Sequence, residues 1–278
     1  MAGLPGTVAA GGRSGQEGTP SGDGNDDALD APEDYPVVTT RDHFEVTWYG
    51  SVSLADGHTE TVYDVDGDWP SAGAELTLFV HGWLNDGESG RDSAHTAEVA
   101  LREADYDDPV VGYVWDADEY VWWTATEIAE RNGAKLANFT TDYLADHPDA
   151  SVRYVAHSLG ARVVLRALAT LHEWGRADAV ESVSLLGGAA DDDAVAADGE
   201  YGDDVEYAAG AVHNYWKDDD AVLQWAYSLA EADAAVGEEG CEGTTPANYE
   251  DHNVDDVPDH FSYPEPGEGC VDDVVADF

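Results

Sequence analysis

Apolar residues along the chain alternate between the spacing of buried strands and the spacing of helices. Short β-branched and aromatic runs predict strands at 75–82, 109–118, 181–188 and 211–216, and apolar residues at helical intervals predict helices around 93–104, 125–145 and 221–233. Residues 151–171 add a strand, a tight turn and a helix in direct succession. This alternation predicts a mostly parallel sheet with helices on both faces, where reactive residues gather at the carboxyl ends of the strands.

The N-terminal part of the chain follows a different pattern. Residues 42–53 and 59–65 alternate apolar and polar positions, which predicts a leading pair of antiparallel strands. Residues 1–40 are rich in Gly, Ser, Asp and Pro and lack a sustained apolar period, so we expect a disordered tail there and one α/β domain over 41–278. Residues 1–10 resemble the end of a secretory signal peptide. We therefore expect a secreted protein, with a cytoplasmic location as the alternative.

The turn within 151–171 carries the most specific local signal. It reads Ala-His-Ser-Leu-Gly over 156–160, a G-x-S-x-G nucleophile elbow with Ala156 in the first glycine position. Small residues are needed on both sides of Ser158 because strand and helix pass close together at such a bend. The pattern alone arises easily by chance, so its weight comes from the strand before it and the helix after it.

A serine hydroxyl needs an adjacent base, and the base needs a third group to orient it. Among the ten histidines, His260 is the favoured base and His252 the alternative, because both follow a plausible acid late in the chain. Asp220 is the favoured acid, since it follows the strand at 211–216 and precedes a helix that it could also cap. Asp219 and Asp191 remain alternatives.

From about residue 42 to residue 263 the chain resembles the α/β-hydrolase superfamily, and within it lipase- and esterase-like members. The resemblance rests on the elbow, on Phe-Val-His-Gly-Trp at 79–83, and on the order Ser, acid, His. Similar hydrolases carry an Asp-x-Val-Leu pattern where this chain has 220–223. The resemblance implies an α/β-hydrolase fold and an oxyanion hole formed by the backbone N–H groups of Trp83 and Leu159. It implies neither an organic cofactor nor a catalytic metal.

Candidates for the substrate pocket are His81, Tyr120, Trp122 and Trp123. The three aromatic residues follow a predicted strand and should lie at the carboxyl edge of the sheet, where they would suit an acyl chain or an aromatic ester. Residues 191–210 lack an amphipathic stripe, which favours a small or open cap. The sequence thus predicts hydrolysis of a small-molecule or lipid ester. Amide, thioester or polyester hydrolysis on the same triad is an alternative, as is a non-catalytic binding protein; the oligomeric state stays open.

The net charge of the chain limits the classes of molecule that it can bind. Sixty acidic residues stand against eleven basic ones, a formal net charge of −49. Nucleic-acid binding is excluded, because phosphate contacts need a basic face, and no apolar run reaches the length of a membrane span. Such a charge suits high salt, where the repulsion between acidic residues is screened. In this acidic composition the chain resembles haloarchaeal-type members of the superfamily. The acidic runs at 191–193 and 218–220 follow from this composition and do not predict a metal site.

The two cysteines, Cys241 and Cys270, lie on either side of His260. An even count in an exported chain predicts one disulfide, worth about 3–4 kcal/mol in the chain-entropy model. Two unrelated buried thiols are the alternative.

Overall fold

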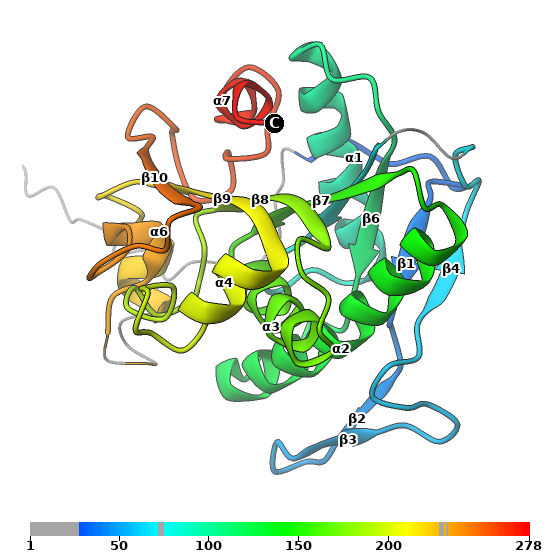
Figure 1. The fold of residues 1–278 in the computed structure, drawn as a ribbon. Helices are drawn as coiled ribbons and strands as arrows, with labels where there is room; N and C mark the ends of the chain where they lie inside the picture. The colour runs from blue at the N-terminus through cyan, green and yellow to red at the C-terminus, as the bar shows by residue number, and fades with distance from the viewer. Residues whose placement is uncertain (1–27, 72–74, 228–230, 232) are drawn as a thin grey trace, which may run out of the picture.

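The computed structural model describes residues 28–71, 75–227, 231 and 233–278, and its central feature is one mostly parallel sheet (Figure 1). The sheet has eight strands in the spatial order β10-β9-β8-β7-β5-β6-β1-β4. Their bounds are β1 (Val37–Thr39), β4 (Asp64–Asp66), β5 (Glu75–Val80), β6 (Val110–Val114), β7 (Ser151–His157), β8 (Val180–Leu186), β9 (Ala209–Trp216) and β10 (Tyr249–Asn253). Neighbouring strands pair in parallel except β4, which pairs antiparallel with β1 at one edge.

Helices cover both faces of this sheet (Figure 1). On one face lie α1 (Gly87–Glu103) and α7 (Val271–Ala276); on the other lie α2 (Trp122–Asp146), α3 (Gly160–Glu173) and α4 (Gly202–Ala208). A π-helical turn, η1 (Leu223–Tyr227), and the short α6 (Val236–Glu239) follow β9. Together with the separate antiparallel pair described below, this architecture confirms the predicted α/β-hydrolase fold. No helix in the described ranges has both the length and the apolar character needed to cross a bilayer.

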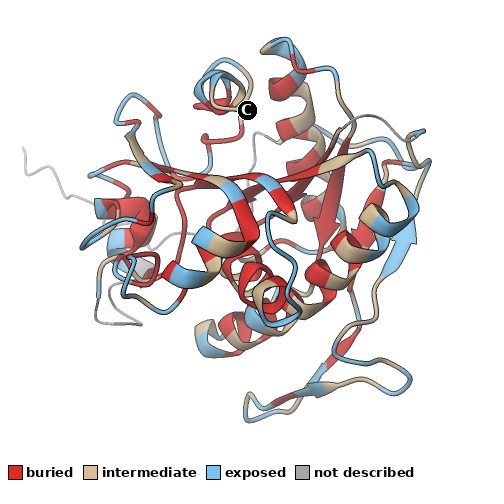
Figure 2. Ribbon diagram, in the orientation of Figure 1, coloured by how far each residue is buried: buried red, intermediate tan, exposed pale blue. Residues whose placement is uncertain are grey.

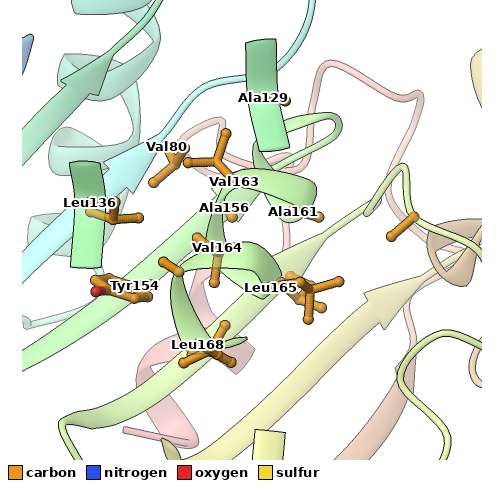
Figure 3. Close-up of a cluster of buried hydrophobic side chains, with 14 of the residues drawn as sticks. Val80, Ala129, Leu136, Tyr154, Ala156, Ala161, Val163, Val164, Leu165 and Leu168 are labelled. Atoms are coloured by element: carbon orange, nitrogen blue, oxygen red, sulfur yellow. The ribbon is translucent and has the colours of Figure 1, made fainter. Parts of the chain in front are cut away.

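The core is densest where α3 packs on the sheet. Figure 3 shows Val163, Val164 and Leu168 of α3 beside Ala156 of β7 and Leu136 of α2, and all five are fully buried. Figure 2 shows the same pattern over the molecule, with buried residues along the strands and on the inner sides of the helices. Because successive strand residues face opposite sides, the sheet separates two apolar clusters, one under α2 and α3 and one under α1 and α7. This packing fixes the start of α3 at Gly160, two residues after Ser158.

The N-terminal strands differ from the prediction in their pairing. β2 (Phe44–Val46) and β3 (Val52–Leu54) form an antiparallel hairpin with each other, while β4 pairs with β1. The predicted pairing of 42–53 with 59–65 is therefore wrong. β1 itself lies inside the segment expected to be a tail, with Val37 and Val38 fully buried, so the folded part begins before residue 41. The signal-like residues 1–10 lie outside the described residues.

Besides β1, the short elements β10, α4, α6 and α7 were not predicted. β10 reads Tyr-Glu-Asp-His-Asn, which has no apolar alternation because it is an edge strand with one neighbour. α4 and α7 have too few turns to show a helical period. α1 also begins earlier than expected, since Asp86 and Ser89 form a capping box ahead of the apolar residues.

The predicted disulfide is absent: Cys241 and Cys270 are free thiols. Cys270 is buried in the cluster under α1 and α7, whereas Cys241 packs against the cluster on the other face. The sheet lies between the two clusters, so the sulfur atoms cannot meet. Burial, the largest influence, raises the pKa of Cys241 to about 11. Secretion of the protein stays a prediction, now without a disulfide to support it.

Candidate active site

Ser158 occupies a strained turn between β7 and α3. Its φ of 53° lies in the left-handed region, which non-glycine residues seldom adopt outside functional turns. Hydrogen bonds on both sides hold it there: its N–H donates to the Leu186 carbonyl (3.0 Å), and its carbonyl accepts from Ala161 and Ala189. Gly160 is required, because a Cβ there would lie 2.3 Å from the Val80 carbonyl oxygen. The backbone therefore presents the Ser158 hydroxyl at the carboxyl end of the sheet.

Three side chains from distant parts of the sequence form one hydrogen-bonded series at this turn. The Ser158 Oγ lies 2.8 Å from His260 Nε2, and His260 Nδ1 lies 2.7 Å from Asp220 Oδ2. All three residues are buried, with Ser158 the most exposed at 9%. The turn after β7 supplies the serine, the loop after β9 supplies the aspartate, and the loop after β10 supplies the histidine.

Asp220 also caps the helical segment that follows it. Its Oδ1 accepts the N–H groups of Val222 and Leu223, each at 3.1 Å. Burial by itself would raise the pKa of Asp220, but the neighbouring His260 and these donors outweigh it, and the net shift is downward. The carboxylate is therefore held charged and fixed in direction beneath the imidazole. Asp220 therefore caps this segment and contacts His260 at the same time.

The alternative acids and the alternative histidine lie in other contacts. Asp219 is exposed and pairs with Lys217 at 3.0 Å. Asp191 accepts a hydrogen bond from the Tyr227 hydroxyl and faces Arg162. His252 lies in β10, where its Nε2 is 3.0 Å from His213 Nδ1. None of the three contacts Ser158 or His260 in the described part of the chain.

Two residues that the sequence analysis did not assign to the site hold the His260 loop. His157 Nε2 donates to the His260 carbonyl at 2.7 Å. The buried Lys217 ammonium donates to the carbonyls of Val257 (2.6 Å) and Pro258 (3.3 Å). The adjacency of His157 to the elbow serine was visible in the sequence, as was the rarity of lysine, of which the chain has two. Both residues act on the backbone of the loop, a role that sequence patterns do not reveal.

The turn at 81–83 lies directly against the serine. A Cβ on Gly82 would come within 2.7 Å of the Ser158 Cβ, so only glycine fits. Within the described residues, the backbone N–H groups of Trp83 and Leu159 have no hydrogen-bond acceptor. Two free donors beside a nucleophilic oxygen are what a developing oxyanion needs.

His81 is not a pocket residue, contrary to the expectation. Its ring is 1% exposed and stacks on Trp115. Nδ1 donates to the Gly82 carbonyl (3.0 Å), and Nε2 accepts the Trp115 backbone N–H (3.2 Å). Both nitrogens are thus used within the protein, and the ring braces the turn at 81–83.

Of the predicted aromatic residues, Trp122 is partly buried, and Tyr120 and Trp123 are exposed. The Trp122 ring packs edge-to-face on Trp83 (5.1 Å between centroids) and on Tyr227 (5.8 Å). Tyr120 and Trp123 are 83% and 58% exposed. Trp122 therefore lies against Trp83 of the turn at 81–83, whereas Tyr120 and Trp123 are surface residues at the start of α2.

Two cavities of about 380 and 630 Å³ lie elsewhere, and neither is lined by Ser158, His260 or Asp220.

The burial of His157 predicts a pH-dependent stability difference. Burial, the largest influence, lowers the pKa of His157 to about 3, whereas an unfolded histidine titrates near 6.5. At about pH 7.5, His157→Phe should lower the free energy of unfolding by about 1–3 kcal/mol, because the buried His260 carbonyl loses its donor. As the pH falls below about 6.5, His157 of the unfolded wild type binds a proton that the folded protein does not bind. The difference in free energy of unfolding between wild type and His157→Phe should therefore shrink by about 1.4 kcal/mol per pH unit.

Guanidinium unfolding of both proteins at about pH 7.5, 6.5 and 5.5 measures this difference. The comparison with the variant is needed because other groups titrate in the same range. Burial raises the pKa of Asp116 and of Asp192 to about 6, so their protonation stabilises the folded protein as the pH falls. These carboxyls are common to both proteins and cancel. A difference that stays constant over this range contradicts a buried neutral His157.

Among solved structures, the chain is similar to several proteins at low sequence identity. A cutinase-like protein from Cryptococcus sp. has 13% identity and a TM-score of 0.40, with 72% of this chain and 90% of that chain covered. A lidless α/β serine hydrolase from Xanthomonas campestris has 14% identity and a TM-score of 0.39, covering 74% and 79%. An esterase from Pyrobaculum calidifontis has 13% identity and a TM-score of 0.41, covering 73% and 75%. The activities named are those of these proteins, and the resemblance to haloarchaeal members finds no support among them.

No curated protein matches the chain. One family matches it over residues 111–265, from β6 through the loop that carries His260, and is described as "Protein of unknown function". The match covers more than half of the sequence and includes Ser158, Asp220 and His260. The chain belongs to this family, DUF726.

Proposed function

We propose that the protein is a serine hydrolase that cleaves carboxylic esters through Ser158, His260 and Asp220. The observation that supports this most strongly is the continuous series from Ser158 Oγ to His260 Nε2 (2.8 Å) and from His260 Nδ1 to Asp220 Oδ2 (2.7 Å). The positive φ of Ser158 and the free N–H groups beside it add to this support. A buried serine in an ordinary structural role would need none of these features.

In the proposed mechanism, Ser158 Oγ attacks the ester carbonyl while His260 Nε2 takes its proton. The carbonyl oxygen becomes an oxyanion, which the backbone N–H groups of Trp83 and Leu159 stabilise. His260 then gives the proton to the leaving alkoxide, an alcohol departs, and an acyl-serine remains. Water attacks this acyl group with the same proton transfers, releasing the carboxylic acid and restoring Ser158. Asp220 keeps the proton on His260 Nδ1 and stabilises the imidazolium.

Esters with an apolar acyl group fit the surroundings of the site best. The rings of Trp83 and Trp122 pack edge-to-face and are partly exposed. Their indole N–H groups already donate to the Glu119 carbonyl and to Glu231, so the surface that they offer is apolar. Amide, thioester and polyester substrates would use the same three residues, so an activity assay is needed to distinguish these substrate classes.

High salt is the environment that we propose for this activity. Both lysines of the chain are buried and bind backbone carbonyls, Lys135 those of Thr59 and Val62 and Lys217 those of Val257 and Pro258. Apart from the pair of Lys217 with Asp219, these amines leave the excess of acidic residues at the surface uncompensated. Salt at about 1 M shortens the Debye length to about 3 Å and screens this repulsion.

A serine-directed fluorophosphonate probe tests the proposal. We expect stoichiometric labelling of the folded protein in about 2 M NaCl, a concentration at which surface repulsion is screened. Peptide mass spectrometry should place the label on Ser158. Denatured protein is the control, because only the assembled triad activates the hydroxyl. A folded protein that stays unlabelled, or is labelled at another serine, would overturn the proposal. A panel of acyl esters of increasing chain length then separates esterase from lipase behaviour.

A further inference from the structure

A second cluster of side chains, unrelated to Ser158, gathers at the opposite edge of the sheet from β4. His213 of β9 faces Glu250 of β10 in the parallel register, and His252 follows two residues later on the same side. Asp277, just after α7, reaches this cluster from the C-terminus. Four potential metal ligands from three elements therefore converge in one place, where β9, β10 and the C-terminal segment meet.

The distances among three of these ligand atoms match those around one metal ion. His213 Nδ1 lies 3.0 Å from His252 Nε2, and Asp277 Oδ2 lies 3.5 Å from His252 Nε2 and 3.8 Å from His213 Nδ1. Zinc ligands at about 2.0–2.1 Å in a tetrahedron are separated by about 3.3–3.4 Å. The three atoms therefore outline one face of such a tetrahedron. Glu250 offers a further carboxylate to this cluster, since the ligand atoms of Glu250, His213 and His252 all lie within 4.8 Å of one another.

The surroundings favour a cation and orient its ligands. The Tyr215 hydroxyl donates to Asp277 Oδ2 at 2.8 Å, and the His252 ring stacks on the Tyr215 ring. Outer hydrogen bonds of this kind fix the direction of ligating carboxylates. The adjacent carboxylates of Asp277 and Glu250 supply negative charge.

We propose that His213, His252 and Asp277, with Glu250, bind a divalent transition-metal ion of the zinc type. Imidazole and carboxylate ligands in tetrahedral arrangement suit zinc better than calcium or magnesium, which prefer oxygen ligands alone. The bound ion would tie the C-terminal segment after α7 to the edge strands β9 and β10. Its role would be structural, since the triad side chains take no part in the cluster.

A second group, His43, His58 and Asp64, has similar composition but fits a metal poorly. The buried ammonium of Lys135 lies 3.4 Å from His43 Nδ1 and already supplies the positive charge there. This group serves as a matched internal control, because it contains the same residue types in the same chain.

Titration calorimetry of the full chain, freed of metal by chelation, tests the site with Zn²⁺ alone. We expect one ion per chain at about 2 M NaCl, where nonspecific attraction to surface carboxylates is screened. His252→Ala and Asp277→Asn should each weaken binding at least about 100-fold, and Tyr215→Phe about 10-fold. His58→Ala should leave the affinity unchanged. Two independent ligand variants guard against the misfolding of one.

Two further measurements distinguish a specific metal site from nonspecific binding of the ion. Co²⁺ should show the intense visible bands of a four-coordinate ion in wild type and lose them in His252→Ala. Zn²⁺ should slow amide hydrogen exchange in α7 and β10. The proposal is overturned if wild type binds no ion, if binding survives both ligand variants, or if His58→Ala removes it.

Discussion

Ser158→Ala should reduce the rate of ester hydrolysis at least about 10⁴-fold, the largest loss expected of any single substitution in this chain. Alanine removes the only atom that can form the acyl intermediate and leaves the N–H groups of Trp83 and Leu159 in place. The residual rate would therefore come from binding and oxyanion stabilisation alone. Initial rates on a short-chain ester, with kcat and KM determined separately, measure the loss. It should fall on kcat, because the hydroxyl contributes little to ground-state binding.

Ser53→Ala is the matched control for this substitution. Ser53 is an exposed residue of the β2–β3 hairpin, and its replacement should keep the wild-type rate. Guanidinium unfolding of both variants shows whether each has folded. Ser158→Ala that folds normally and retains more than a tenth of the activity would remove Ser158 from the mechanism.

The parts of the fold that could be predicted are those with long apolar periods. The strands that became β5 to β9 and the helices that became α2 and α3 were visible because each buries a whole face or stripe. β10 was missed although its loop delivers His260, because an edge strand of five residues needs few apolar positions. The N-terminal pairing was wrong for a related reason: short alternating segments specify a strand but not its partner.

The three residues proposed to carry the chemistry were found by their order in the chain, whereas those that position them were not. The elbow motif and the helix-capping position pointed to Ser158 and Asp220 because local sequence dictates both. His157 and Lys217 act through carbonyls of a loop about 40 to 100 residues away in sequence, and backbone acceptors leave no residue-type signal. The disulfide failed for the same kind of reason, since sequence could not show that the sheet separates Cys241 from Cys270.

Asp220→Asn should lower kcat by about 10⁴-fold with little change in KM. The carboxylate accepts the proton-bearing Nδ1 of His260 and leaves Nε2 free to accept from Ser158. An amide can turn its NH₂ group toward Nδ1, which would favour the opposite tautomer and place a proton on Nε2. The base would then be blocked although the geometry is nearly unchanged. The caps to Val222 and Leu223 use the other carboxylate oxygen, and the Asn side chain can still accept one of them.

Asp219→Asn distinguishes this effect from a general loss of negative charge in the loop. The two residues are neighbours in sequence, yet Asp219 is 73% exposed and pairs with Lys217, whereas Asp220 is buried against His260. The steady-state rate of Asp219→Asn should therefore stay within about threefold of the wild-type rate, because an exposed ion pair contributes about 0–1 kcal/mol. Asp191→Asn should behave like Asp219→Asn, since Asp191 contacts Tyr227 and faces Arg162. If Asp191→Asn or Asp219→Asn caused the large loss while Asp220→Asn did not, the acid assignment would be refuted and the Ser158–His260 pair would remain.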